Sequence, residues 1–321
     1  MITFFKKIID SYVFSLKLKR LKKINSSFIL VKIFFIRVFF SYPLIRNFIK
    51  SKKGQNILSD NFFEKKTSSN NILKNLEKDG YDSNKLTSNI TEKIINEVPG
   101  LVASISLKER KKNKIDTSNF YCKDLIDFKN FTLKNKISHI KINLDLDKDS
   151  TLKDLISSNF ATDIAYNYLN SNSVTLNAVI FISNSLSDGI SDSELSDNAQ
   201  KFHTDINFSK FYKIFIYLND VNSQNGPHIF IPGTHKKKNS EHLNIERLND
   251  NEIFNSYDEK VKFVGKKGTI FFEDTFGFHK GEEPKESSRI TLVVEYGKNK
   301  IKYEKNSIFI NVGRGGTVNE N

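Results

Sequence analysis

Apolar positions recur at helical spacing in the first half of the chain and follow strand-like runs in much of the second half. Residues 72–79 and 88–98 each place apolar side chains on one helical face, and a Pro-Gly pair follows the second segment. Residues 151–169 show the clearest helical pattern, which Thr151 can cap at its amino end. The pattern therefore predicts at least three helices before the chain changes character.

Beyond these helices the spacing becomes that of β-strands, with short apolar runs separated by turn-forming residues. The predicted strands cover residues 174–182, 213–218, 228–231, 261–264, 269–272 and 290–296. Many short strands after a helical first half are typical of a double-sheet jelly roll with helices on one side. We therefore expect an α+β fold of the jelly-roll or cupin-like kind, with flanking helices.

Residues 1–50 interleave lysines and arginines with large apolar side chains, and Lys32 and Arg37 interrupt an apolar run over 28–40. A membrane-spanning helix needs roughly 20 mostly apolar residues, so this run is too short and too charged. No small-residue cleavage site follows it, as a secretory signal would require. Two interpretations remain open: a basic helical extension on an anionic membrane surface, or helices that pack on the main domain.

A chain of 321 residues can bury a large core. We expect a basic, apolar helical extension and linker over residues 1–70, one domain over 71–300 and a carboxy-terminal tail over 301–321. The chain has a single cysteine and so cannot form an intramolecular disulfide. The lack of such a bond is typical of proteins in a reducing compartment. The expected location is the cytoplasm, with peripheral contact at the inner face of the membrane if residues 1–50 bind lipid.

The charge balance is strongly basic, with 50 Lys and Arg against 37 Asp and Glu and a formal net charge of +13. Such a balance suits nucleic acid, anionic lipid or small acidic ligands and does not distinguish them. Much of the excess lies in the first 53 residues, and the sequence has neither zinc-finger spacing nor a basic motif interleaved with aromatic residues. We therefore expect no nucleic-acid partner.

The residues most informative about chemistry are His203, Asp205 and His279. His203 and Asp205 are two positions apart, so on an extended strand both side chains point to the same face. His279 follows the predicted strand over 269–272 and can supply a third ligand. Two histidines and one carboxylate form the facial triad of non-haem iron(II) oxygenases, which leaves coordination positions open for other ligands.

Arg289 lies at the start of the last long predicted strand, ten residues beyond His279. Open metal positions can take the keto oxygen and adjacent carboxylate of 2-oxoglutarate, whose distal carboxylate then needs a cation. A guanidinium matches a carboxylate with two parallel hydrogen bonds, and Thr291, on the same strand face, can add its hydroxyl. The pattern predicts iron(II) as the metal and 2-oxoglutarate as the co-substrate.

A series of short motifs in the second half of the chain resembles the phytanoyl-CoA dioxygenase family. In order, they are His203-Thr204-Asp205, Asn225-Gly226-Pro227-His228, Pro232-Gly233-Thr234-His235, the strand from Gly268 to Phe272, His279 and Arg289. Residues 76–81 (Leu-Glu-Lys-Asp-Gly-Tyr) also resemble the opening segment of that family. The likeness extends over residues 72–297, and residues 1–70 have no counterpart in the family.

The resemblance implies a double-stranded β-helix, iron(II), 2-oxoglutarate and an enzyme that hydroxylates an unactivated carbon–hydrogen bond. Members that halogenate replace the metal-binding carboxylate with a small residue, so Asp205 favours hydroxylation. The expected partner is a small-molecule substrate, with anionic and lipid-linked molecules both open. Residues 183–200, which precede His203, are a candidate lid.

Two alternatives remain open beside the dioxygenase. One is a catalytically silent jelly roll that serves as a binding module. The other is a zinc enzyme that uses the same His/Asp/His site without 2-oxoglutarate, so that Arg289 would have no role. The metal that supports activity would separate the zinc enzyme from the dioxygenase.

The remaining histidines are not assigned as ligands. His228 and His235 flank a turn beside the metal-binding strand, whereas His139 and His242 lie outside the motifs and are expected at the surface. The carboxylates just before His279, Glu273 and Asp274, are candidates to hydrogen-bond a metal ligand.

Overall fold

The computed structural model describes most of the chain beyond the first 52 residues, namely residues 53–59, 61–107, 123–186, 189–205, 207–239, 242, 247–300 and 310–313. The predicted extension over 1–50, and with it the expected membrane contact, lies outside these residues. Within them, no helix is both long and apolar enough to cross a membrane. The division of the chain into 1–70, 71–300 and 301–321 stays a prediction.

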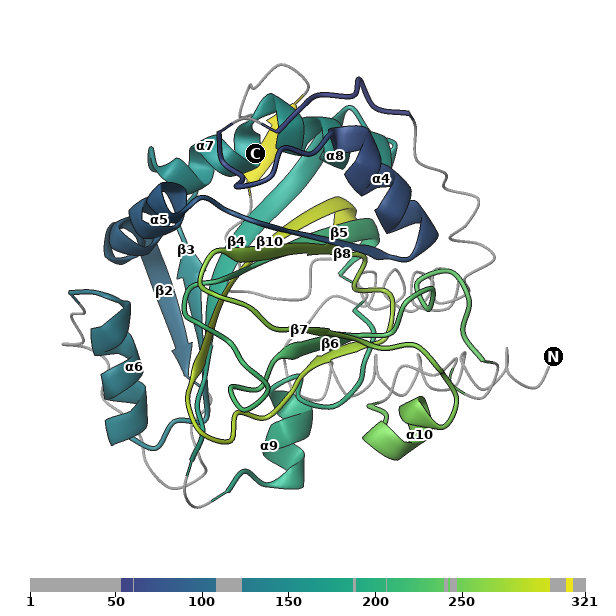
Figure 1. The fold of residues 1–321 in the computed structure, drawn as a ribbon. Helices are drawn as coiled ribbons and strands as arrows, with labels where there is room; N and C mark the ends of the chain where they lie inside the picture. Colours follow the sequence, from purple (N-terminus) through teal and green to yellow (C-terminus); the bar gives the residue numbers. More distant parts are fainter. Residues whose placement is uncertain are drawn as a thin grey trace, which may run out of the picture.

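The largest element is an eight-stranded antiparallel sheet in the order β1-β8-β5-β10-β4-β3-β2, with β11 paired to β4 outside that path (Figure 1). In chain order its strands are β1 (Tyr81–Lys85), β2 (Val102–Leu107), β3 (His139–Leu144), β4 (Ser173–Ser183), β5 (Phe208–Tyr217), β8 (Thr269–Glu273), β10 (Arg289–Lys300) and β11 (Ile310–Gly313).

A smaller antiparallel sheet, in the order β7-β6-β9, lies across from the large one (Figure 1). Its strands are β6 (His228–Phe230), β7 (Val261–Phe263) and β9 (His279–Gly281). His228 and His279 from this sheet line the same cavity as Arg289 from the large sheet. The two sheets therefore face each other across a cavity, and the predicted mixture of helices with antiparallel sheets is confirmed.

Helices α4, α5, α7 and α8 lie on the other side of the large sheet (Figure 1). The described helices are α4 (Ser69–Lys78), α5 (Ser88–Leu101), α6 (Leu125–Lys134), α7 (Thr151–Ser157), α8 (Asn159–Leu169), α9 (Asp192–Asp197) and α10 (Asp250–Phe254). The main apolar core fills the layer between these four helices and the sheet. This core holds the sheet rigid beneath the cavity.

Alternation along β10 and β4 separates the core from the cavity. Four apolar side chains of β10 belong to the main core: Ile290, Leu292, Val294 and Tyr296. The intervening residues of the same strand line the cavity: Arg289, Thr291, Val293 and Glu295. β4 repeats the pattern, with Asn177, Val179 and Phe181 on the cavity side. Successive strand residues point to opposite faces, so one strand serves both layers.

Three details of the predicted helices are wrong. The helix predicted over 151–169 is two helices, because Ser158 is extended (φ −56°, ψ 153°) and its hydroxyl caps α8 by accepting from Ala161 N. Ser150, rather than Thr151, caps α7. α5 continues through Pro99 to Leu101, since a proline in the last turn removes only one backbone hydrogen bond.

Candidate active site

His203, Asp205 and His279 meet at one point, with one potential ligand atom from each lying within 4.8 Å of the others. Backbone hydrogen bonds position them. His203 and His279 exchange N–H···O bonds of 3.0 and 3.1 Å, and Asp205 N donates to Thr275 O at 2.9 Å. His203 belongs to an isolated bridge instead of the regular strand we expected. The side chains nevertheless converge as the spacing predicted.

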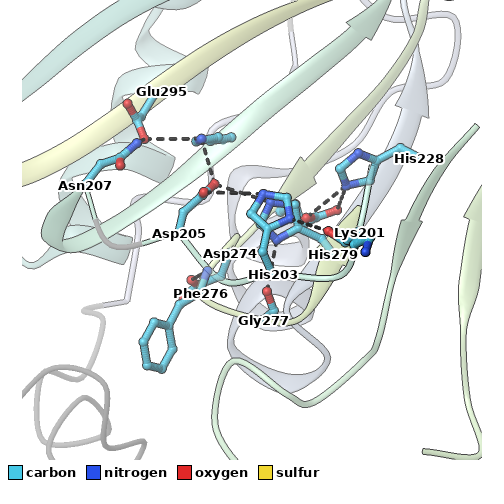
Figure 2. A network of polar contacts seen from close by, with 12 residues as sticks. Lys201, His203, Asp205, Asn207, His228, Asp274, Phe276, Gly277, His279 and Glu295 are labelled. Atoms are coloured by element: carbon cyan, nitrogen blue, oxygen red, sulfur yellow. Dashed lines mark hydrogen bonds and ion pairs between the residues drawn. The ribbon is translucent and has the colours of Figure 1, made fainter. Parts of the chain in front are cut away.

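Each histidine of this group presents its Nε2 atom to the centre. His203 Nδ1 lies 2.9 Å from Lys201 O, and His279 Nδ1 lies 3.0 Å from Gly277 O (Figure 2). A carbonyl oxygen only accepts, so each Nδ1 carries a proton and donates it there, which leaves Nε2 as the nitrogen that faces the centre. Burial lowers the pKa of His203 well below its ordinary value, which keeps the ring neutral. Neutral imidazoles of this tautomer are metal ligands.

Lys213 from β5 holds the carboxylate of Asp205, with Nζ 2.8 Å from Oδ2. Burial alone would raise the pKa of Asp205, but the ammonium of Lys213 is foremost in holding it well below its usual range. Asp205 Oδ2 also lies 3.3 Å from His279 Nε2, and Oδ1 lies 3.7 Å from His203 Nε2. The group therefore offers one anionic oxygen donor and two imidazole nitrogen donors.

Lys213→Met is expected to weaken iron(II) binding by about 10- to 100-fold, the usual effect of losing a group that orients a metal ligand. Methionine keeps the length of the side chain without its charge, so Asp205 would lose its anchor. The measurement is an anaerobic iron(II) titration in the presence of 2-oxoglutarate. Lys210→Met is the matched control, because Lys210 is a buried lysine of the same strand that does not line the cavity. Equal iron affinity in both variants would contradict this role.

His228 and Glu273 form a buried pair beside the metal-binding group, with His228 Nε2 3.1 Å from Oε1 and 2.9 Å from Oε2 of Glu273. Burial raises the pKa of Glu273 to about 8 and lowers that of His228 well below its ordinary value. At neutral pH the pair is thus a carboxylic acid that donates to a neutral imidazole. The His228 ring stacks on His279 at 5.6 Å between centroids, so the pair supports a predicted metal ligand.

Glu273→Gln is expected to change how stability depends on pH. The folded protein keeps a proton on Glu273 up to about pH 8, whereas the unfolded chain loses it near the ordinary value of 4.5. Wild-type stability therefore falls as pH rises through this window, and the glutamine variant lacks that fall. Denaturant unfolding of the metal-free proteins should show the variant gaining on wild type between about pH 5 and pH 8. A difference that is constant over this range would contradict the assignment.

The triad opens into a cavity of about 410 Å³ that the inner face of the large sheet lines. Arg289 and Thr291 from β10 lie in its wall and are 8% and 6% exposed. Arg289 donates to Glu282 O at 3.2 Å and to Ser183 Oγ at 3.4 Å. Thr291 Oγ1 is buried and has no hydrogen-bond partner within the described part of the chain. A buried guanidinium beside an unsatisfied hydroxyl is suited to a carboxylate ligand.

Gly281 makes room for this guanidinium. A Cβ built at position 281 would occupy the space of Arg289 Nη2 and Cζ. Gly281 lies two residues beyond His279 on β9, so one short strand carries both a predicted metal ligand and the space for the arginine. Position 281 had no assigned role in the sequence.

Several expectations about the surroundings of the site are wrong. His139 and His242 are buried, at 8% and 7% exposure, and His139 lines the cavity, stacked on Phe181. Glu273 contacts His228 and Asp274 accepts from Tyr168 Oη at 2.6 Å, so the two predicted metal-ligating histidines are oriented by backbone carbonyls instead. His235 Nε2 lies 3.4 Å from Glu77 O.

The end of the candidate lid lines the cavity, whereas Lys238 and Lys280 do not. Asn198 and Ala199, at the end of the segment 183–200, line the cavity. Lys280 pairs with Asp250 at 2.6 Å, and Lys238 donates to Phe276 O at 2.7 Å, so both are engaged away from the cavity. Whether residues 183–200 close over a ligand stays a prediction.

Sequence reasoning missed the polar residues of the cavity that come from strands other than β10. Those from other strands are Lys213, Asn177, His139 and Lys141, and two more are Glu295 in the middle of β10 and Asn207 just after Asp205. Each is a polar residue that interrupts an otherwise apolar strand or follows the His203–Asp205 motif. That interruption is the signal that could have indicated them.

The phytanoyl-CoA dioxygenase family model matches residues 127–289, which is just over half of the chain and contains both predicted histidine ligands, Asp205 and Arg289. The chain belongs to the phytanoyl-CoA dioxygenase family. Iron(II) and 2-oxoglutarate are the metal and co-substrate of this family, and the protein is an enzyme of the dioxygenase type. No curated protein matches the chain.

Solved structures similar to this family member share little sequence with it. The epimerase SnoN in complex with Fe³⁺, α-ketoglutarate and nogalamycin RO is 14% identical, with 72% of this chain and 83% of that chain covered and a TM-score of 0.47. HygX from Streptomyces hygroscopicus, with nickel, 2-oxoglutarate and hygromycin B bound, is 11% identical over 71% and 86% of the chains, with a TM-score of 0.45. EctD from S. alaskensis is 14% identical over 70% and 75%, with a TM-score of 0.46. These similarities are too weak to indicate a substrate.

Proposed function

We propose that this protein is an iron(II)- and 2-oxoglutarate-dependent hydroxylase with a double-stranded β-helix fold, whose metal is held by His203, Asp205 and His279. The observation that carries the proposal is the convergence of these three side chains in the wall of the cavity that Arg289 and Thr291 also line. The substrate is a small molecule.

The donor set fits iron(II). Two neutral imidazole nitrogens and one carboxylate oxygen are the ligands of non-haem iron(II) oxygenases that leave positions open for co-substrate. The histidines already direct Nε2 to the centre, and the pKa of Asp205 is held low, so its carboxylate is ionised for metal binding at neutral pH.

Arg289 and Thr291 fit the distal carboxylate of 2-oxoglutarate. Burial lowers the pKa of Arg289, yet a guanidinium stays protonated in proteins, and its charge is buried without a carboxylate in hydrogen-bond contact among the described residues. The free Thr291 hydroxyl can donate to the same group. A carboxylate from the co-substrate would satisfy both residues.

The chain supplies orientation and shielding. When bound, iron(II) with 2-oxoglutarate and dioxygen would supply the oxidising chemistry, which places one oxygen atom in a substrate carbon–hydrogen bond and the other in succinate, with loss of carbon dioxide. Lys213 fixes the Asp205 carboxylate, while Arg289 sets the direction of the co-substrate. Val179, Phe215 and Val293 form an apolar band across the sheet between Arg289 and Lys213. Asp205 favours hydroxylation over halogenation.

The test needs no substrate. Metal-free protein is mixed with iron(II) and 2-oxoglutarate without oxygen, and a visible metal-to-ligand charge-transfer band is expected. The band requires that the keto oxygen and adjacent carboxylate of 2-oxoglutarate chelate the iron, so it reports metal and co-substrate in one site.

Two outcomes would contradict the proposal. Iron that binds without producing the band would indicate a metal site that does not chelate 2-oxoglutarate, as in a binding module. Activity supported by zinc in the absence of 2-oxoglutarate would indicate a zinc enzyme at the same three residues.

A further inference from the structure

We infer that the substrate is a neutral, hydroxyl-rich small molecule, a sugar derivative or polyol, which Asn177 and Glu295 bind by hydrogen bonds. The inference rests on the proposed function, because it takes His203, Asp205 and His279 as the reacting centre. It adds the chemical class of the substrate and the residues that select it.

The cavity has two chemically different ends along β10. Arg289 and Glu295 both line it, and six residues of strand separate them by roughly 20 Å. Arg289 marks the end assigned to the co-substrate. Lys213 joins the Glu295 end to the metal-binding group, since its Nζ is 3.5 Å from Glu295 Oε1 and 2.8 Å from Asp205 Oδ2. The co-substrate is assigned to the Arg289 end, so the Glu295 end of the cavity is the one left for a substrate.

Asn177 is the residue that most clearly lacks a partner at this end. It faces Glu295 across the paired strands β4 and β10, lines the cavity and is 7% exposed. Its carboxamide makes no hydrogen bond within the part of the chain that the structure describes. The carboxamide opens onto the cavity, where a ligand with its own donor and acceptor groups can pair with both of its polar atoms.

Glu295 adds an acceptor that the protein has already oriented. Asn207 Nδ2 donates to Glu295 Oε1 at 2.7 Å (Figure 2). Lys213 Nζ lies 3.5 Å from the same oxygen. A carboxylate held in this way can accept from a substrate hydroxyl without losing rotamer freedom on binding. Asn177 and Glu295 together offer both donor and acceptor groups at adjacent positions, which is the pattern that recognises neighbouring hydroxyls.

The charges at this end favour a neutral molecule. Two carboxylates, Glu295 and Asp205, share the single ammonium of Lys213, so this end disfavours an anionic substrate. Iron(II) bound to Asp205 would offset the remaining negative charge, so a cationic substrate is not required. An apolar acyl chain would leave the Asn177 carboxamide and the Glu295 carboxylate buried against methylene groups, which costs their hydrogen bonds to water. A neutral polyhydroxylated molecule meets each of these conditions.

The test measures succinate formed from 2-oxoglutarate by the iron-loaded full-length protein in the presence of defined probes. The neutral set is methyl α-D-glucopyranoside, methyl β-D-galactopyranoside, myo-inositol and sorbitol. Glucose 6-phosphate is the anionic probe, and octanoyl-CoA and palmitoyl-CoA are the acyl probes. At least one neutral probe is expected to stimulate succinate formation, and Asn177→Leu should raise its half-saturating concentration by about 10- to 100-fold.

Asn143→Leu is the matched control, because Asn143 is a buried asparagine of the neighbouring strand β3 that does not line the cavity. It should keep the wild-type half-saturating concentration, and thermal melts check that both variants fold. Stimulation by an acyl or phosphorylated probe alone, or by no neutral probe, overturns the inference. The inference is also overturned if a neutral probe has the same half-saturating concentration with Asn177→Leu as with the wild type. The charge-transfer band of the wild type distinguishes the two kinds of failure. If the band forms, only the substrate inference has failed; if no band forms, the proposed function has failed.

Discussion

Replacing His203 or His279 by alanine is expected to abolish the charge-transfer band and to reduce succinate formation to background. Each ring supplies one of the three donors, and its Nε2 atom already points to the centre. Loss of a group that only orients a ligand costs about 10- to 100-fold in metal affinity, so loss of a ligand should cost at least about 100-fold. Anaerobic iron(II) titration of each variant, followed at the band and by metal analysis after desalting, measures the effect.

His242→Ala is the control for these variants. His242 is as buried as His203, but it packs against Tyr257 and Phe278 and lies outside the cavity. It should lose packing and keep wild-type iron affinity. If His203→Ala also kept wild-type affinity, the three converging residues would not be the metal site.

Arg289→Ala is expected to raise the half-saturating concentration of 2-oxoglutarate by about 30-fold or more while iron still binds. Removing one partner of a buried charge pair costs about 2 to 5 kcal/mol, and each 1.4 kcal/mol is a factor of about ten. Titration of 2-oxoglutarate into the iron-loaded variants, followed at the charge-transfer band, measures the change. Thr291→Val should show a smaller effect, about 10-fold, because it removes one hydrogen bond to a charged group.

2-Oxopentanoate supplies the internal check, since it carries a methyl group where 2-oxoglutarate carries the distal carboxylate. Wild type should bind it far more weakly than 2-oxoglutarate, whereas Arg289→Ala should bind the two compounds with similar affinity. A variant that keeps a strong preference for 2-oxoglutarate would show that another cation, such as Lys141 in the same wall, binds the distal carboxylate.

The parts of the site that the sequence predicted are those that depend on local periodicity. His203 and Asp205, and likewise Arg289 and Thr291, are two residues apart on extended backbone, so each pair shares a face whatever the rest of the chain does. Most of the predicted strands and helices exist for the same reason. The break at Ser158 was missed because apolar spacing continues through it, and only the capping of α8 by that hydroxyl reveals two helices.

Other strands carry too little local signal to be predicted. β1 reads Tyr-Asp-Ser-Asn-Lys, with no apolar face, and exists because its backbone pairs with β8. β9 has three residues, and its pairing with β6 defines it. Backbone hydrogen bonds to a neighbouring strand decide these elements, and a neighbour distant in sequence leaves no mark on the segment itself.

The sequence by itself determined the chemistry that this protein can perform, because residue types and short spacings specify which donors share a face. Tertiary structure alone decided which distant residues surround those donors. The registers of β4 and β5 on β10 place Asn177 and Lys213 beside Glu295, and His203 pairs with His279 across a bridge of distant segments. A shift of one residue in any register would turn these side chains to the opposite face. Long-range register therefore set the surroundings of the candidate metal centre and the polar end of the cavity.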